Sequence, residues 1–205
     1  MRDEEKDRYS FVRVNDVAPD FEARTTHGLL RLSSFRGRWL IFFSHPADFT
    51  PVCTTEFVSL ARAHSRFEAL GISLLGLSID SLYSHIAWLK AMKDIFGVDI
   101  PFPVVEDPSM IVGRAYGMID ANATDSSGIR STYYIDPDGV VRAMTNYPMT
   151  VGRSVDEMYR LGAALIGVEG RETLAPADWT PGSKFLKPVT EVAQDCPDWF
   201  CRFEE

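Results

Sequence analysis

Apolar residues along the chain follow two spacings, and each spacing predicts one kind of element. Continuous apolar runs at 39–43 and 72–78 are typical of buried strands. Apolar residues recur every three or four positions over about 54–70 and again from Ile86 to Phe96, which predicts two amphipathic helices. Asp80 or Ser81 is the expected cap of the second helix. Strand, helix, strand and helix in this order predict a right-handed crossover and a parallel pair of strands.

Shorter segments extend the predicted sheet. We expect strands at 22–26, 28–32, 102–107, 130–135 and 140–144, a brief helix at 110–116 and a longer helix at about 154–166. The last two strands flank Asp136-Pro137-Asp138-Gly139, a turn sequence that predicts a hairpin. The expected fold class is α/β, with helices flanking a central mixed sheet.

The last part of the chain has a different character. Residues 171–205 contain four prolines and little periodicity, so we expect the core domain to span 1–170 and a C-terminal arm to span 171–205. The arm carries Trp179, Phe185, Trp199 and Phe200, and such aromatic surface is not expected to stay in water. We therefore predict that the arm packs on a neighbouring subunit.

Composition and charge narrow the functional classes. The chain has 205 residues, of which 45% are hydrophobic and 24% charged, as in ordinary globular proteins. Its net charge of −8 argues against nucleic acid or an anionic membrane as a main partner. Because no apolar run approaches about 20 residues and the first eight residues are strongly charged, we expect neither a membrane span nor a signal peptide. With only three cysteines, a cytoplasmic protein with working thiols is expected.

The connection between the first two core elements carries the candidate chemistry. Thr50-Pro51 predicts a helix start, with Thr50 as N-cap and Pro51 at the first helical position. Cys53 then falls in the first turn, where unpaired N–H groups and the helix dipole favour an anion. This position is expected to lower the pKa of the Cys53 thiol and make it a nucleophile. The alternative is an inert structural cysteine buried in the core.

The surrounding residues resemble a known family. Pro46-x-x-x-Thr50-x-x-Cys53 is similar to the active-site signature of the peroxiredoxins, and the stretch from Ser44 to Glu56 resembles their one-cysteine subfamily. Asn15 departs from the glycine that opens the family's entry segment. The resemblance implies a thioredoxin-like fold, a thiol-dependent peroxidase and no cofactor. Its implied substrates are hydrogen peroxide and alkyl hydroperoxides, and its implied assembly is a dimer that forms a decamer.

The resemblance also implies roles for individual residues. Cys53 would attack the peroxide, Thr50 would bind it, and Pro46 would shape and shield the pocket. Arg130, in Arg130-x-x-Tyr133-x-Ile135-Asp136, stands where the family carries its active-site arginine, and would supply the cation and bind substrate. Read by itself, it could equally be a solvated charge at a strand end. Arg153 also matches a family position and is expected to support the site.

Two further polar residues near Cys53 stay open. Glu56 could orient one of the arginines, and a surface carboxylate on a helix is an equally good interpretation. His45 resembles the histidine that lies near the reacting sulfur in the one-cysteine subfamily. A structural histidine is about as plausible, and we do not assign His45 as a base.

Cys196 and Cys201 decide the rest of the mechanism. Their C-x4-C spacing could suggest a metal pair, but a structural zinc site wants four ligands and the histidines lie far away in sequence, so no metal is expected. A second thiol can instead resolve a sulfenic acid by forming a disulfide. A similar C-terminal pair is familiar in archaeal peroxiredoxins, in which the last cysteine resolves between subunits. We therefore predict that Cys201 resolves Cys53 of another chain, with Cys196 accessory and a thioredoxin-like donor as reductant.

Other functions remain alternatives to this relay. A one-cysteine mechanism with an external thiol reductant would leave the tail cysteines incidental. A ring-forming holdase chaperone is a second possibility, though nothing in the sequence argues for it as the primary role. Some members of the one-cysteine subfamily carry a lipase-like Gly-Asp-Ser-Trp-Gly motif. When that motif is aligned on Trp39, this chain has Arg38 at the serine position, so a lipase-like activity would lack its nucleophile. A thiol–disulfide oxidoreductase lacks the second cysteine of its motif after Cys53.

Overall fold

The computed structural model describes residues 12–119, 128–189 and 200–204. It divides into two compact units, one up to Val155 and one from Asp156 onward. The first unit holds the sheet and the predicted site, and the second holds the last helix and the arm. The separation of the arm at residue 171, and its packing on a neighbouring subunit, stay predictions.

A seven-stranded mixed sheet forms the centre of the first unit. In sheet order its strands are β2 (Gly28–Arg31), β1 (Glu22–Thr25), β5 (Val104–Glu106), β4 (Ile72–Ser78), β3 (Trp39–Ser44), β6 (Arg130–Ile135) and β7 (Val141–Tyr147). β3 pairs in parallel with β4 and antiparallel with β6. The predicted mixed sheet, parallel pair and hairpin are therefore confirmed.

β3 lies at the middle of the packing because every one of its residues is buried. Successive side chains of a strand point to opposite faces of the sheet, so the apolar run contributes side chains to the hydrophobic core on each face. Phe42 packs against the Tyr116 ring on one face, and Phe43 packs against Phe57 and Phe102 on the other. A continuous apolar run is thus what a central strand requires.

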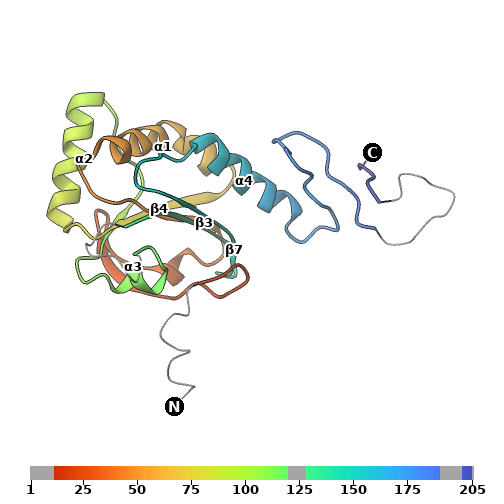
Figure 1. Cartoon of the computed structure of the whole chain (residues 1–205), viewed down its shortest axis with the longest axis horizontal. Helices are drawn as coiled ribbons and strands as arrows, with labels where there is room; N and C mark the ends of the chain where they lie inside the picture. The colour runs from red at the N-terminus through yellow and green to blue at the C-terminus, as the bar shows by residue number, and fades with distance from the viewer. Residues whose placement is uncertain (1–11, 120–127, 190–199, 205) are drawn as a thin grey trace, which may run out of the picture. The chain divides into compact units, whose positions relative to one another are not determined.

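Helices lie on both faces of this sheet. α1 (Pro51–Ala69) and α2 (Leu82–Phe96) lie on one side, and the short α3 (Ile111–Ala115) lies on the other (Figure 1). A 3₁₀ turn (Leu32–Phe35) follows β2. Ser81 caps α2 by accepting a hydrogen bond from the Ser84 N–H, as one of the two predicted caps.

The buried side of α2 differs from what its apolar spacing suggests. His85, Trp88 and Met92 are buried, whereas Ile86 and Phe96 are 51% and 46% exposed. A buried histidine is tolerated because its ring nitrogens find hydrogen-bond partners inside the protein, as described below. Apolar periodicity predicted the helix correctly but could not reveal that a polar residue helps to define its buried side.

The second unit contains α4 (Val155–Val168), except for its first residue, and the described part of the arm. Trp179 is 5% exposed and stacks on Phe185 with ring centroids 4.9 Å apart, and the Arg160 guanidinium donates to the Trp179 carbonyl. Phe200, in contrast, is 64% exposed. Part of the arm's aromatic surface is therefore covered within the same unit.

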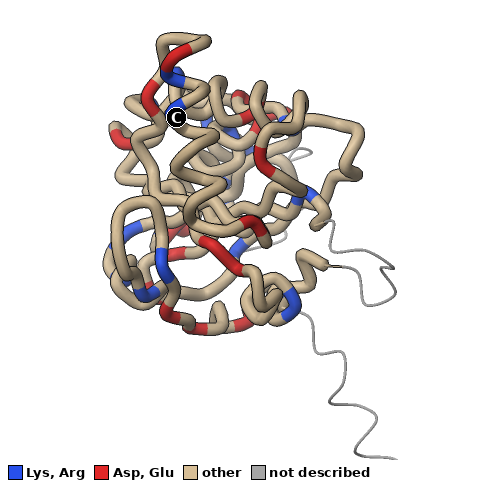
Figure 2. The backbone as a smooth tube through the Cα atoms, turned by 90° about the vertical axis from the view of Figure 1, so that its left-hand side faces the viewer, with Lys and Arg blue, Asp and Glu red and all other residues tan. Residues whose placement is uncertain are grey.

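Two properties of the whole described chain bear on its partners. Among the described residues, no helix has both the length and the apolar character that crossing a bilayer requires. Acidic and basic residues are interspersed along the described trace (Figure 2).

Candidate active site

Cys53 lies in the first turn of α1, as predicted, and is completely buried. Thr50 occupies the N-cap position and Pro51 the first helical position, but the predicted side-chain cap is wrong: Thr50 makes no capping hydrogen bond. Its hydroxyl instead donates to the Ala47 carbonyl at 2.9 Å, because the preceding loop turns back at Phe49, whose φ is +58°. The hydroxyl hydrogen is engaged, so the Thr50 oxygen can act as a hydrogen-bond acceptor.

Arg130 brings a positive charge to the sulfur. It is the first residue of β6 and is 2% exposed, so it is not a solvated strand-end charge. Its Nη1 lies 3.3 Å from the Cys53 Sγ and 2.8 Å from a carboxylate oxygen of Glu56. Its Nε and Nη2 both donate to the Met149 carbonyl, at 3.1 and 2.8 Å. A guanidinium nitrogen of Arg130 therefore lies within hydrogen-bond distance of the Cys53 sulfur.

Glu56 links the two predicted arginines and is buried, so it is not a surface carboxylate. Arg153 binds it through Nε at 2.9 Å and Nη2 at 2.8 Å, and through its backbone N–H at 2.7 Å. Burial by itself raises the pKa of Glu56, but hydrogen bonds from Arg153 and the charges of Arg153 and Arg130 outweigh it and lower the pKa. Glu56 is therefore ionised and fixes both guanidinium groups.

The loop before Arg153 must approach α1 closely for this contact. A Cβ on Gly152 would lie 3.2 Å from a methyl carbon of Val52, tighter than an ordinary contact. Gly152 therefore allows the segment after β7 to lie against the first turns of α1. Arg153 also donates to the Ser131 carbonyl at 3.0 Å, which ties it to β6 beside Arg130.

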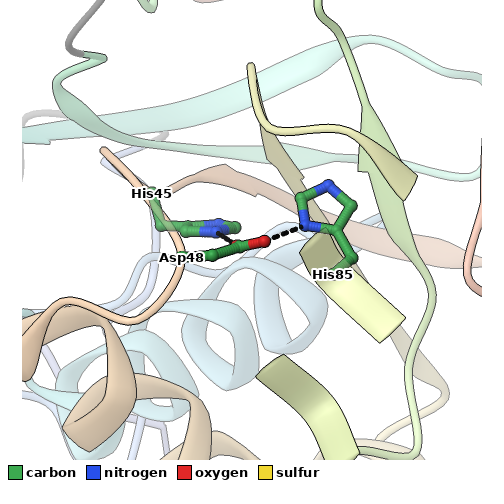
Figure 3. A group of neighbouring side chains, drawn as sticks. All are labelled: His45, Asp48 and His85. Carbon is green, nitrogen blue, oxygen red and sulfur yellow. Dashed lines mark hydrogen bonds and ion pairs between the residues drawn. The ribbon is translucent and has the colours of Figure 1, made fainter. Parts of the chain in front are cut away.

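His45 is part of a buried polar group that the sequence did not indicate. Its Nε2 lies 2.9 Å from Asp48 Oδ1, and the other oxygen of Asp48 lies 2.8 Å from Nδ1 of His85 (Figure 3). Among the described residues, Nδ1 of His45 has no hydrogen-bond partner. These are side-chain types that can bind metals. Because the atoms that face one another are engaged in mutual hydrogen bonds, we interpret the group as a hydrogen-bonded cluster.

Comparisons with known proteins agree with this geometry. Residues 14–144 match the model of the AhpC/TSA family. Peroxiredoxin 2 of Thermoplasma acidophilum is 47% identical over 174 residues, which cover 85% of this chain and 86% of that protein. A peroxiredoxin of Aquifex aeolicus is 45% identical over 212 residues, covering 93% of this chain and 96% of that protein.

The chain is a peroxiredoxin of the AhpC/TSA family.

Solved structures of other peroxiredoxins support the thioredoxin-like fold. A yeast mitochondrial 1-Cys peroxiredoxin superposes with a TM-score of 0.84 at 33% identity, covering 94% of this chain and 99% of that one. A cysteine-to-serine mutant of peroxiredoxin 6 of Arenicola marina superposes with a TM-score of 0.82 at 31% identity, covering 89% of this chain and 86% of that one. The predicted fold and family are therefore confirmed. As a peroxiredoxin, the chain is a thiol-dependent peroxidase that uses peroxide substrates and a thiol reductant.

The structure places the predicted site residues of this peroxiredoxin in two groups. Cys53, Thr50, Arg130 and Arg153 lie together, and Pro46 is buried in the loop that leads to them. Cys201 is exposed and carries a free thiol in the second unit. Cys196 lies outside the described residues. The pairing of Cys53 with Cys201 thus stays a prediction.

Acid is expected to weaken this peroxiredoxin through Glu56. Because the folded-state pKa of Glu56 is lowered, its contribution to the free energy of unfolding is present above pH 4.5 and is lost as the pH falls through the folded-state pKa. Glu56→Gln should therefore destabilise the protein by about 3 kcal/mol at pH 7 and by less at pH 4. Urea unfolding at both pH values measures the difference.

The matched control for this prediction is Glu68→Gln, which changes an exposed carboxylate on the same helix, paired with His64. It should cost less than about 1 kcal/mol at either pH. An equal loss of stability in the Glu56→Gln protein at pH 7 and pH 4 would contradict the assignment.

Proposed function

We propose that this peroxiredoxin reduces hydrogen peroxide and small alkyl hydroperoxides through a relay between Cys53 of one chain and Cys201 of another. The observation that carries the first step is the 3.3 Å contact between the Arg130 guanidinium and the Cys53 sulfur. Pro46, Thr50 and Arg153 complete the site. The relay adds a resolving thiol to a chain whose solved relatives include a 1-Cys peroxiredoxin.

In the first step the Cys53 thiolate attacks one oxygen of the peroxide. The S–O bond forms as the O–O bond breaks, the sulfur is oxidised to a sulfenic acid, and the leaving oxygen takes up a proton to become water or an alcohol. Arg130 stabilises the negative charge first on sulfur and then on the leaving oxygen. The Thr50 oxygen accepts a hydrogen bond from the peroxide O–H, because its own hydrogen is held by Ala47. Backbone N–H groups near 52–53 add donors.

The burial of the site supports small substrates. Cys53 has no exposed surface, and Pro46 is buried in the loop that leads to it. Because the Cys53 sulfur is enclosed by protein, we expect hydrogen peroxide to reach it more readily than bulky hydroperoxides.

In the second step a thiol of Cys201 attacks the sulfenic sulfur of Cys53. The S–S bond forms and the hydroxyl group leaves as water, which balances the oxidation of two thiols by one peroxide. The exposure of Cys201 supports this role. From Gly170, about 30 residues can extend up to about 100 Å, so contact with another subunit is within reach. Cys196 would be accessory.

A thioredoxin-like donor then reduces the disulfide. In the yeast relative, thiol resolution proceeds via glutathione and thioredoxin systems, which supports a thiol reductant of this kind here.

We further propose a dimer that assembles into a decamer, with the arm of 171–205 on a neighbouring subunit. The small number of cysteines, with two of them proposed as working thiols, supports a reducing, cytoplasmic setting. A one-cysteine mechanism with an external thiol is the alternative.

One equivalent of peroxide is expected to produce a covalent dimer. The reduced protein is oxidised, separated on a non-reducing gel and digested for peptide mass spectrometry, which should identify Cys53 joined to Cys201. Cys201→Ser should abolish the crosslink, whereas Cys196→Ser, as matched control, should retain it. Sulfenic or sulfinic Cys53 without a crosslink in the unmodified protein would overturn the relay and support the one-cysteine alternative.

A further inference from the structure

We propose that His85 is a positioning residue of the peroxide site: doubly protonated, it forms a buried ion pair with Asp48 that holds the loop of residues 45–50 in its reactive shape. The inference rests on the role proposed above for Pro46 and Thr50, which both belong to this loop. His85 itself lies on α2 and reaches the loop from outside (Figure 3).

Asp48 connects the loop to its surroundings through both its side chain and its backbone, in addition to the hydrogen bond from the His45 N–H to the Leu77 carbonyl of β4. One carboxylate oxygen bonds His45 within the loop at 2.9 Å, and the other bonds His85 on α2 at 2.8 Å. The Asp48 backbone N–H donates to Asp80 at 2.9 Å, and Asp80 also accepts a hydrogen bond from Ser78 at the end of β4. Asp48 therefore connects the loop both to the residues that follow β4 and to α2.

The partners of His85 define its protonation state. Nδ1 of His85 faces a carboxylate oxygen of Asp48, and Nε2 faces the backbone carbonyl of Val105 at 3.1 Å. A carbonyl oxygen and an ionised carboxylate can only accept hydrogen bonds. Both ring nitrogens must then carry hydrogen, which makes His85 an imidazolium with a charge opposite to that of Asp48.

The neighbouring charges fit this assignment. Burial by itself raises the pKa of Asp48, but hydrogen bonds from His45 and His85 outweigh it and lower the pKa, so Asp48 is ionised. Burial lowers the pKa of His45, so His45 is neutral and donates from Nε2. Asp48 and His85 therefore form a pair without net charge. Two other carboxylates lie close enough to matter. The charge of Asp80 favours a higher pKa at His45, and the charge of His85 favours a lower pKa at Glu106 on β5. Both negative charges favour a cation in this cluster.

The loop needs such support because its backbone is strained. Phe49 adopts a φ of +58°, which is a rare conformation for a bulky side chain, and its side chain is 58% exposed. Packing of Phe49 therefore supplies little to hold the turn. Thr50 follows directly, so a relaxed turn would displace the Thr50 hydroxyl from its position at the start of α1. Losing the pair should impair peroxide binding more than it impairs the thiolate itself, which Arg130 stabilises independently.

Neutron diffraction from deuterated crystals at pH 7 tests the protonation state directly. We expect nuclear density for deuterium on both Nδ1 and Nε2 of His85 and none on the Asp48 carboxylate. Deuterium on only one ring nitrogen of His85, or on Asp48, would overturn the ion pair. The result does not depend on peroxidase activity, so it separates failure of this inference from failure of the proposed relay.

Variant kinetics test the positioning role. The first step is followed by stopped flow in a single turnover, which needs no resolving thiol, and is compared with alkylation of Cys53 by iodoacetamide, which needs only the thiolate. His85→Phe should lower the peroxide rate constant by about 10- to 100-fold and leave the alkylation rate within about threefold. His85→Gln, which keeps one N–H donor group, should fall between His85→Phe and the unmodified protein.

His64→Phe is the matched control, because His64 is also a helix histidine beside a carboxylate but lies outside the cluster. It should leave both rates unchanged. A peroxide rate within twofold of the unmodified value for His85→Phe, or a parallel change in both rates, would contradict positioning. If His85→Phe does not fold, the rates of His85→Gln and the neutron result decide the question.

Discussion

Replacing Cys53 by serine should lower peroxide consumption by more than about 10³-fold, which is the scale of loss when a covalent nucleophile is removed. A serine hydroxyl beside Arg130 is not ionised near neutral pH, so the attacking anion is lost while its surroundings stay in place. The variant should remain folded, since the substitution exchanges one small buried atom. Steady-state peroxide consumption with excess thiol reductant measures the effect, and circular dichroism verifies the fold.

Cys201→Ser provides the matched control for this prediction, because it removes a thiol of the same chain without touching the first step. It should still consume one peroxide per chain in a single turnover, even if later turnovers slow. Full turnover by the Cys53→Ser protein would exclude Cys53 as the reacting thiol.

The main elements of the fold could be predicted because they depend on local pattern. A continuous apolar run at β3 has few interpretations other than a strand buried on both faces, and Thr50-Pro51 marks a helix start. The turn Asp136-Pro137-Asp138-Gly139 likewise specified the β6–β7 hairpin. In each case the residues that decide the structure are neighbours in the chain.

The arrangement around the sulfur depends on distant residues and was only partly predictable. Arg130 and Arg153 were suggested by resemblance, but their burial and their common partner Glu56 follow from the pairing of β6 with β3. Glu56 lies three residues after Cys53, on the side of α1 that faces these arginines. That spacing was the available signal, and by itself it does not distinguish an arginine partner from a surface carboxylate.

Asp48 and His85 were the residues that sequence reasoning missed. They are 37 positions apart and meet because α2 packs beside the loop that precedes α1. Asp48 lies between His45 and Thr50, at a position that the signature Pro46-x-x-x-Thr50-x-x-Cys53 leaves unspecified. The exposure of Ile86 beside a buried His85 shows why hydrophobic periodicity alone assigns the side of α2 incorrectly.

The partner of the Thr50 hydroxyl was also predicted incorrectly, although it lies only three residues away in the chain. The sequence Thr50-Pro51 predicts a side-chain cap, yet the hydroxyl bonds Ala47 three residues earlier. A cap and a turn within the loop compete for one hydroxyl, and the left-handed backbone at Phe49 decides for the turn. The Thr50 oxygen can therefore accept a hydrogen bond, as the proposed peroxide site requires.

Removing the Arg130 guanidinium should have the second largest effect. Arg130→Met is expected to lower the first-step rate constant by about 10²- to 10³-fold, because it removes the charge that we propose stabilises both the thiolate and the leaving oxygen. It should also lower the free energy of unfolding by about 3 kcal/mol, since Glu56 would keep only one buried guanidinium partner. Stopped-flow oxidation and urea unfolding measure the two effects.

Arg130→Lys sharpens the test, because a lysine keeps the charge but lacks the planar fork that reaches Cys53, Glu56 and Met149 together. It should recover part of the rate and little of the stability. Arg142→Met is the matched control: Arg142 is also a strand arginine paired with a carboxylate, Asp136, but it is 42% exposed and outside the site. If Arg130→Met oxidised within about threefold of the normal rate, electrostatic stabilisation by Arg130 would not be what drives the reaction. A loss restored by lysine alone would instead mean that charge, rather than the geometry of the fork, is what Cys53 requires.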